Sequence, residues 1–399
     1  MIIERIQISL IRLPFRFSYG HKQKTHKNVF AVICQVTDDK GSYGLGEAVP
    51  RTYVTGESAE SAFFVMQAIG EDLLGKEFTS YNDVQIYMAD LAYRWRSPFP
   101  SCAFCAIDLA LHDCMARSQD LDMAAYLGAE SKPIQYTGSL GISDKTRLLA
   151  LLSVYRLSGI NTFKLKVGDD DDLERLKTVK NFMGADTLVF ADANGAWSFK
   201  EAPEKINRLA EKGIWAIEEP LHIPKPPNET GETDEKIQID RDALMDETHY
   251  EQYARLRKKI SIPVILDESL ISPNSFNKIV DFSAADILNI RLSKLGGYSL
   301  VPGMLAGKPD DMKFSLCAMV GESPILAAAG YFFGCAHTDH LYMQGYSHRI
   351  LHGTKFTRGG PIMRRGKVFA RKAQTGFGIS IKQDILKRLT LNEVVLTDG

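Results

Sequence analysis

Apolar and polar residues alternate along the first fifty positions in the way that is typical of β-strands. Ile6, Ile8 and Leu10 alternate with polar neighbours, and two further apolar runs, VFAVICQV and SYGLGEA, flank a turn signal at residues 38–41. This pattern predicts a three-stranded antiparallel meander. From GESAESAFFVMQAIGEDLL to AAYLGAE the apolar residues recur at helical spacing, and ESKP marks a boundary near residue 133. We therefore predict an α+β unit over residues 1–132.

A different pattern follows over residues 133–350, where short apolar runs alternate with amphipathic helical segments. The runs are IQYTGSLGI, TFKLKVG, TLVFADANG, WAIEEPL, PVILDES, DILNIRLS, KFSLCAMVGE and LYMQGYS. Strands that alternate with helices form parallel βαβ units, and eight of them suit a closed (β/α) barrel. An open doubly wound sheet is the alternative, although no glycine-rich phosphate motif follows the first run. Residues 351–399 do not continue the repeat.

Composition limits the class of partner. The 399 residues include 48 Lys and Arg against 49 Asp and Glu, so no basic field points to nucleic acid or to an anionic membrane surface. No stretch reaches the roughly 18 uninterrupted apolar residues that span a bilayer. The chain has six cysteines and no secretion signal, so we expect the cysteines to be small core residues rather than a disulfide framework. We expect a cytoplasmic protein that binds a small molecule, with no nucleic-acid or membrane partner.

Two lysines lie two residues apart in a run that otherwise has the pattern of a buried strand. Lys164 and Lys166 point to the same side of that strand, near the carboxyl ends where barrel active sites form. Buried ammonium groups need counter-charge. The ends of the next three runs supply it, with Asp192 and Asn194, Glu218 and Glu219, and Asp267 and Glu268. Each residue alone could be an ordinary solvated one, but carboxylates from three successive strands suit a hard cation such as Mg²⁺.

These motifs, in the order Lys-x-Lys, Asp-x-Asn, Glu-Glu-Pro and Asp-Glu-Ser, resemble the enolase superfamily, and specifically its muconate lactonizing enzyme and mandelate racemase branches. GLGEA, AIDLALHD and KLGG extend the resemblance over nearly the whole chain. The resemblance implies an α/β fold, a modified TIM-type (β/α)7β barrel with an α+β capping domain. The segment 351–399 would return to that cap, and the protein would form a homo-oligomer.

The resemblance also implies roles for the site residues. Asp192, Glu218 and Asp267 would hold one Mg²⁺ per active site, and Lys166 would remove the proton α to the carboxylate of a small substrate. Lys164 and the metal would keep the pKa of Lys166 low. The metal would stabilise the enediolate, as is general for enolase-superfamily sites.

One position departs from the family pattern. Many members of the muconate lactonizing branch begin a Lys-x-x-Lys-x-Gly-Gly run on the sixth strand with a second lysine, whereas NIRLSKLGG has Arg291 there. Arginine stays protonated, so it is a poor base but a good electrostatic stabiliser. Lys294, three residues further on, is expected on the other face of the strand or in the following loop. The His–Asp dyad of mandelate racemase is also absent, because Glu322 and Arg291 stand at those strand ends.

We therefore expect one-base chemistry, either elimination or cycloisomerisation, with Lys166 as base and Arg291 as electrostatic stabiliser. One alternative is a racemase or epimerase of an amino-acid derivative or dipeptide, which needs a second proton donor. Another is a non-catalytic member of the family that binds a metal or ligand.

Substrate contacts are expected from strand ends, cap loops and an insertion. The stretch from Glu218 to Asp267 is about twice as long as that from Asp192 to Glu218. Residues 222–249 therefore have the pattern of an inserted loop, which either overhangs the active site or is a surface excursion. The candidate substrate-binding residues are Asn194, Glu268, Glu322, His21, Arg51, Tyr53 and Thr55.

Overall fold

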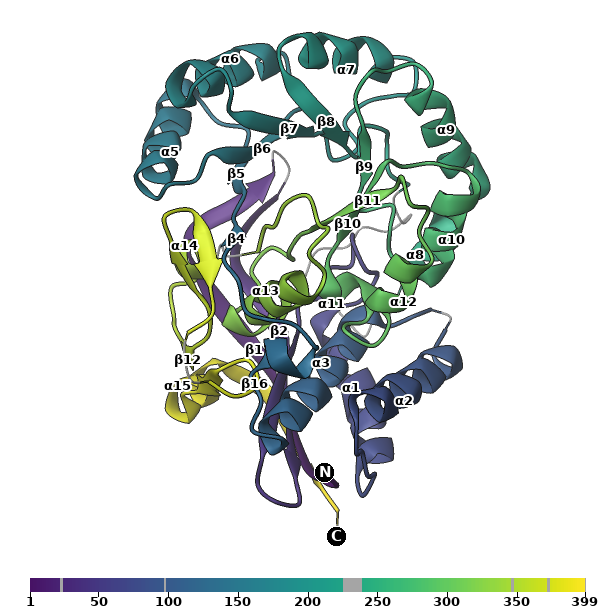
Figure 1. Ribbon diagram of the computed structural model, residues 1–399, viewed down its shortest axis with the longest axis vertical. Coiled ribbons are helices and arrows are strands. Elements are labelled where there is room, and N and C mark those ends of the chain that lie inside the picture. Colours follow the sequence, from purple (N-terminus) through teal and green to yellow (C-terminus); the bar gives the residue numbers. More distant parts are fainter. Residues whose placement is uncertain (22–23, 97, 225–238, 346–347, 372–373, 399) are drawn as a thin grey trace.

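The computed structural model of the protein describes residues 1–21, 24–96, 98–224, 239–345, 348–371 and 374–398. A barrel of parallel strands ringed by helices lies beside a cap made of an antiparallel sheet and helices (Figure 1). Both ends of the chain are in the cap, close to each other (Figure 1). None of the described helices is both long and apolar enough to cross a membrane.

The cap is built on a four-stranded antiparallel sheet with the order β16-β1-β2-β3. Its strands are β1 (Ile3–His21), β2 (Lys24–Asp38), β3 (Tyr43–Ala48) and β16 (Thr390–Thr397). The first three are the predicted meander. The fourth strand was missed: β16 pairs with β1 from the other end of the chain, with Arg5 opposite Thr397. Most residues of β16 are exposed, and its apolar face is short, with Val394 and Leu396 packed against the cap core, so the sequence carries little strand signal there.

Four helices follow β3 in the chain before the barrel begins. They are α1 (Ala59–Leu73), α2 (Tyr81–Arg94), α3 (Ser101–Ser118) and α4 (Met123–Tyr126). α1 begins at a capping box formed by Ser58 and Ser61, and α2 at one formed by Ser80 and Asp83. Nearly all of α3 is buried, because it contacts β2 and β3 in the cap and α11 (Leu292–Leu295) in the barrel. α3 is therefore one of the elements through which the cap meets the barrel.

Seven parallel strands form the barrel sheet in the order β11-β10-β9-β8-β7-β6-β5. They are β5 (Gly138–Leu140), β6 (Thr162–Lys166), β7 (Leu188–Asp192), β8 (Ile214–Glu218), β9 (Val264–Leu266), β10 (Ile287–Ile290) and β11 (Lys313–Leu316). The eighth apolar run closes the ring with single bridges, because Met343 pairs in parallel with both Leu316 and Tyr136. The predicted modified barrel with a cap is confirmed, although the start of the first run, β4 (Ile134–Gln135), pairs outside the barrel with β14 (Lys367–Phe369).

The barrel helices follow the strands in the expected alternation. They are α5 (Lys145–Leu157), α6 (Asp172–Met183), α7 (Ala202–Glu211), α8 (Arg241–Leu244), α9 (Glu247–Arg257), α10 (Pro273–Asp281), α11, α12 (Val301–Ala306) and α13 (Pro324–Ala336). The remaining elements are α14 (His348–Leu351), β12 (Thr357–Gly359), β13 (Ile362–Arg364), β15 (Ile379–Ile381) and α15 (Gln383–Leu389). They lead the chain from the barrel to β16 in the cap. The domain boundaries at residues 132 and 350 stay a prediction.

An apolar layer inside the barrel supports the site. It contains Phe190, Ala216, Ile265, Ile287 and Tyr342. The first three lie two residues before Asp192, Glu218 and Asp267, so each points to the same side of its strand as the acid that follows it. The acids are thereby placed directly above an apolar layer, at the carboxyl ends of the strands.

Candidate active site

The two lysines of β6 are held by the acids of the neighbouring strands. Lys166 is paired in register with Asp192, and Asp192 with Glu218, so the three strand ends are level. Lys164 Nζ lies 2.9 Å from Asp192 Oδ2 and 2.6 Å from Glu218 Oε1, and the residue is only 5% exposed. Burial alone would lower the pKa of Lys164, but the attraction of Asp192 and Glu218 outweighs it and raises that pKa well above its usual value. Lys164 is therefore a fixed positive charge.

Lys166 lies further out and is the more accessible of the two. Its side chain is 16% exposed, and its Nζ lies 3.4 Å from Asp192 Oδ2. It also donates to Asn194 Oδ1. Asn194 has φ +44°, a left-handed conformation that asparagine tolerates, and its Nδ2 donates to Glu268 Oε1 at 3.2 Å. Lys166 is thus placed at the mouth of the barrel, where a substrate could reach its amine.

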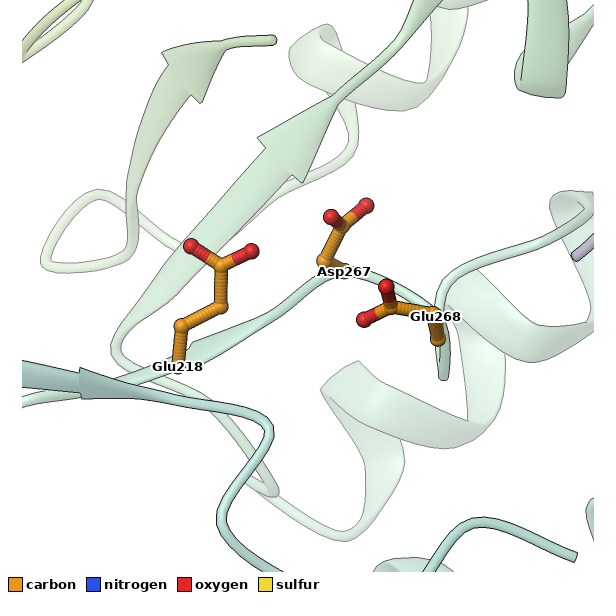
Figure 2. Close-up of side chains that lie close together, drawn as sticks. All are labelled: Glu218, Asp267 and Glu268. Atoms are coloured by element: carbon orange, nitrogen blue, oxygen red, sulfur yellow. The ribbon is translucent and has the colours of Figure 1, made fainter. Parts of the chain in front are cut away.

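Three carboxylates form a close group near Lys164. Ligand atoms of Glu218, Asp267 and Glu268 all lie within 4.8 Å of one another, from the end of β8 and the segment after β9 (Figure 2). Asp192, which the sequence placed in the ligand set, stands outside this close group because its Oδ2 faces both lysines. The predicted set of Asp192, Glu218 and Asp267 stays a prediction, with Glu268 as a further oxygen donor beside it.

The residues present fit a divalent cation. Glu218 Oε2 and Glu268 Oε2 are buried and have no hydrogen-bond partner among the described residues. Burial, and the other carboxylates nearby, raise the pKa of both Glu218 and Glu268. A hard cation with oxygen ligands would satisfy those orphaned oxygens and stabilise the ionised carboxylates, which is the preference of Mg²⁺.

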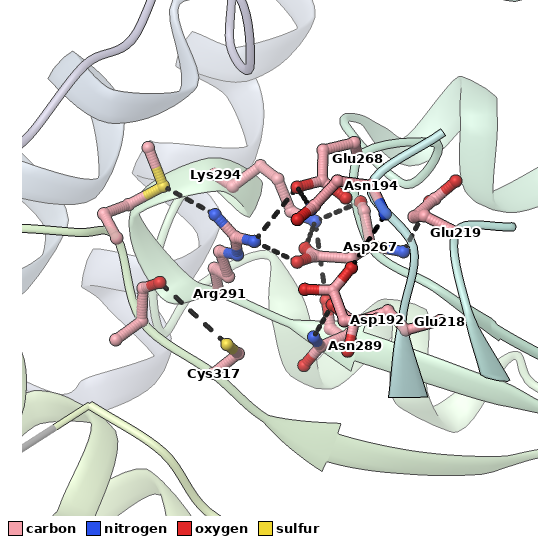
Figure 3. Close-up of polar contacts among 12 residues, drawn as sticks. Asp192, Asn194, Glu218, Glu219, Asp267, Glu268, Asn289, Arg291, Lys294 and Cys317 are labelled. Atoms are coloured by element: carbon pink, nitrogen blue, oxygen red, sulfur yellow. Dashed lines mark hydrogen bonds and ion pairs between the residues drawn. The ribbon is translucent and has the colours of Figure 1, made fainter. Parts of the chain in front are cut away.

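Two cations meet at Asp267. Arg291, directly after β10, contacts Asp267 Oδ2 and lies 3.5 Å from Glu268 Oε1 (Figure 3). Its Nη1 donates to Met319 Sδ at 3.6 Å. Lys294 Nζ lies 2.7 Å from Asp267 Oδ1, and its side chain is 0% exposed. Burial opposes ionisation of Asp267, but Arg291 and Lys294 outweigh it and lower the pKa of that carboxyl.

The position of Lys294 corrects the prediction made for it. We expected Lys294 on the far face of a strand or in a loop. The chain instead turns into α11 immediately after Arg291, and one helical turn brings residue 294 back over Asp267. Arg291 itself stands four strands from Lys166 in the ring, through β7, β8 and β9 to β10, and therefore across the barrel mouth from it.

The remaining predicted substrate contacts lie around the rim. Arg51 is buried, and its guanidinium donates to Val320 O at 2.9 Å and to Pro50 O at 3.3 Å. Thr55 Oγ1 donates to Arg51 O at 3.4 Å, and Tyr53 is 37% exposed.

Glu322 is buried and accepts from Met319 N at 3.2 Å. Glu322 and Arg291 both line a small cavity beside the site. The side chain of His21 lies outside the described part of the chain.

Sequence reasoning missed several side chains at strand ends. Gln344, in the run that closes the barrel, accepts from Cys317 Sγ at 3.1 Å and donates to Ser139 Oγ at 3.0 Å. Asn289 Nδ2 donates to Glu218 Oε1 at 3.1 Å. Their positions near the carboxyl ends of barrel strands were the available signal. Their residue types are too common to stand out alone.

Glu219 was noted only as the partner of Glu218, yet it shapes the site. Its Oε1 accepts from Asp267 N at 2.7 Å and from Ser269 N at 2.8 Å. Its Oε2 accepts from Tyr253 OH at 2.8 Å and from Ser269 Oγ at 2.9 Å. Glu219 therefore fixes the backbone that presents Asp267.

The predicted insertion, residues 222–249, is described only at its two ends, because residues 225–238 lie outside the described part. Where the chain resumes, Ile239 N donates to Gly56 O at 2.8 Å. Gly56 has φ +81°, and a Cβ there would collide with the backbone of Ile239. The end of the insertion thus packs on the cap loop that carries Tyr53 and Thr55.

Comparison with known proteins decides the family. Residues 5–128 match the mandelate racemase / muconate lactonizing enzyme N-terminal domain, and residues 148–238 and 242–385 match the enolase C-terminal domain-like family. The chain belongs to the mandelate racemase / muconate lactonizing enzyme family of the enolase superfamily.

Relatives of this family member include racemases and epimerases. An N-succinyl-L-Arg/Lys racemase of Bacillus cereus is 27% identical over 98% of both chains. An L-Ala-D/L-Glu epimerase of Bacillus subtilis is 27% identical over 75% of each. Among solved structures, a dipeptide epimerase of Cytophaga hutchinsonii, complexed with Mg and the dipeptide D-Ala-L-Val, matches the whole of both chains with a TM-score of 0.82 and 21% identity. At that identity the structural likeness concerns the fold alone.

Proposed function

We propose that this protein is a Mg²⁺-dependent racemase or epimerase, which removes and returns the α-proton of an N-acylated amino acid or a dipeptide. The observation that carries the proposal is the placement of Lys166, an accessible amine at the barrel mouth beside the buried Lys164 ammonium and the acidic cluster. The choice of racemase or epimerase, over the elimination or cycloisomerisation that we expected from sequence, is supported by the names of the relatives that match most of the chain.

Each residue has a distinct role in this proposal. Lys166 takes the α-proton from one face of the substrate. Lys164, fixed by Asp192 and Glu218, keeps a positive charge on the same side of β6 as Lys166. Asp192, Glu218 and Asp267 would hold Mg²⁺, which when bound would stabilise negative charge on the substrate carboxylate. Arg291 supplies a second fixed charge across the mouth.

A second candidate, one-base elimination or cycloisomerisation, is favoured by a specific residue. Racemisation needs a proton donor on the face opposite Lys166, and Arg291 occupies that side of the mouth. A guanidinium is a very weak acid, so it serves charge stabilisation better than proton transfer. Both candidates begin with the same proton abstraction by Lys166. They differ in whether both enantiomers of a substrate, or only one, exchange the α-proton with solvent.

The test is α-proton exchange, followed by NMR in deuterium oxide with and without Mg²⁺. The substrates would be both enantiomers of N-succinylamino acids, epimeric dipeptides, acid sugars and muconolactones. Racemase or epimerase function predicts exchange of both enantiomers or epimers, and one-base chemistry predicts exchange of one. Lys166→Ala should abolish exchange on the face that Lys166 serves. Lys177→Ala, a change at an exposed lysine of α6, is the matched control.

Two results would contradict the proposal. Exchange that survives undiminished in Lys166→Ala would overturn the base assignment. Mg²⁺ binding without exchange of any substrate would instead favour the non-catalytic, ligand-binding member of the family.

A further inference from the structure

The segment between β11 and α13, residues 317–323, borders the active site, and we call it the β11 loop. Met319 in this loop contacts the Arg291 guanidinium through its sulfur, 3.6 Å from Nη1. The loop also carries Cys317 and Glu322, which line the same small cavity as Arg291. The conformation of the β11 loop therefore limits where the Arg291 guanidinium can lie.

Three side chains from outside the barrel hold this loop. Arg51 donates to Val320 O at 2.9 Å, and His352 Nε2 donates to Gly321 O at 2.9 Å. Gly321 has φ +90°, and a Cβ there would lie 3.0 Å from atoms of Phe15 and Val29. The third side chain, Glu47, acts at the end of the loop.

Glu47 makes the most extensive of these contacts. It is the fifth residue of β3, in the cap, and it is fully buried. Its Oε1 accepts from Ser323 N at 2.8 Å, and its Oε2 accepts from Ser323 Oγ at 2.7 Å and from Leu326 N at 3.2 Å. These N–H groups open α13, a helix of 13 residues, where a carboxylate is also favoured by the helix dipole.

We propose that Glu47 is a positioning residue for the reaction: from the cap, it fixes the β11 loop and, through Met319, holds the Arg291 guanidinium at the barrel mouth. The chain of contacts runs from β3 to Ser323, along the loop to Met319, and from Met319 to Arg291. This inference rests on the proposed function only in giving Arg291 a part in the reaction. The placement of the loop by Glu47 can be measured without any substrate.

The variant Glu47→Gln tests the proposal. Glutamine has nearly the shape of glutamate, but an NH2 group replaces one of the two carboxylate oxygens. That NH2 group cannot accept the hydrogen bonds that the oxygen accepts, so the hydrogen bonding to Ser323 and Leu326 is disrupted. We expect the rate constant for α-proton exchange to fall by roughly 10- to 100-fold with little change in KM, since misplacing a catalytic-site charge costs about that much. The matched control is Asp113→Asn, because buried Asp113 accepts from Leu45 N at 2.9 Å, in the same strand as Glu47, and from Phe377 N at 2.6 Å, but from no residue of the β11 loop among the hydrogen bonds of the described chain.

A double-variant cycle separates positioning from general destabilisation. If Glu47 acts through Arg291, then Glu47→Gln should slow exchange much less in an Arg291→Met background than in the wild type. The proposal is wrong if Glu47→Gln lowers the rate of α-proton exchange by the same factor in both backgrounds. It is also wrong if Glu47→Gln slows exchange no more than Asp113→Asn does. Should Glu47→Gln fail to fold, Ser323→Ala removes one donor of the same contact and should give a smaller loss in the same direction.

An NMR measurement keeps the test independent of activity. With the 12 methionines labelled at the methyl carbon, the Met319 signal can be assigned from its loss in Met319→Leu. Glu47→Gln and Arg291→Met should both shift that signal, and Asp113→Asn should leave it in place. An unmoved Met319 signal in Glu47→Gln would overturn the inference. If the signal moves but the wild type exchanges no substrate, the proposed function fails while the structural link stands.

Discussion

Lys164 and Lys166 share one oxygen of Asp192: their Nζ atoms lie 2.9 and 3.4 Å from the same Oδ2. Among the described residues, Lys164 alone of the two has a second carboxylate partner, since its Nζ also lies 2.6 Å from Glu218 Oε1. One strand thus carries two lysines in different electrostatic roles. The inner one completes a buried ion-pair network, and the outer one faces the mouth of the barrel.

Lys164→Met should destabilise the metal-free protein and also slow exchange. The change leaves Asp192 and Glu218 buried without their shared counter-charge, which typically costs about 3–5 kcal/mol of unfolding free energy. Urea unfolding without Mg²⁺ measures this. Lys177→Met, at an exposed lysine of α6, should change the same free energy by less than about 0.5 kcal/mol. Equal effects of the two changes would contradict a buried network at Lys164.

Arg291→Met should slow α-proton exchange by roughly 100-fold, the usual effect of removing a fixed charge that stabilises the transition state. Arg291→Lys should lose less, and should raise the exchange rate of the slower enantiomer relative to the faster one, because it places an amine across the mouth from Lys166. Arg208→Met, at an exposed arginine of α7, is the matched control. An Arg291→Met enzyme with full activity would exclude Arg291 from the reaction.

Mg²⁺ should bind and raise the melting temperature, because a ligand that binds only the folded state stabilises it. Calorimetric titration can rank the candidate ligands. Asp192→Asn, Glu218→Gln and Asp267→Asn should each weaken Mg²⁺ binding more than Glu268→Gln does. If Glu268→Gln proves more harmful than Asp192→Asn, the close group of Glu218, Asp267 and Glu268 is the true ligand set.

Buried Glu57 should make stability depend on pH. Burial raises its pKa to about 7, although N–H groups of Cys102 and Ala103 oppose the shift. The folded chain therefore keeps a proton at Glu57 from about pH 4.5 to 7 while the unfolded chain has lost it, so the free energy of unfolding should fall as pH rises through that window. Glu57→Gln should flatten this slope in urea unfolding between pH 5 and 8. A slope equal to that of the wild type would show that Glu57 does not titrate there.

Much of the fold and part of the site followed from local rules. Because side chains alternate sides along a strand, Lys164 and Lys166 had to lie on one side of it. The acids at the ends of successive strands had to meet, because the ends of parallel strands lie together. Lys294 was misplaced because strand periodicity was extended past Arg291, where the chain already turns into a helix. The position of Asp192 Oδ2 beside both lysines, outside the close group of acids, depends on distances that sequence does not encode.

The pairing of β16 with β1 also bears on how the chain is made. Synthesis from the N-terminus delivers β1 first and β16 last, so the outer edge of β1 stays open until residues 390–397 leave the ribosome. An unpaired edge of that kind is a site for wrong associations. Every strand of the barrel sheet precedes β16 in the chain, so the strand that completes the cap sheet is synthesised after them. A chain that stopped before Thr390 would carry every strand of the barrel sheet beside a cap in which that edge of β1 is exposed.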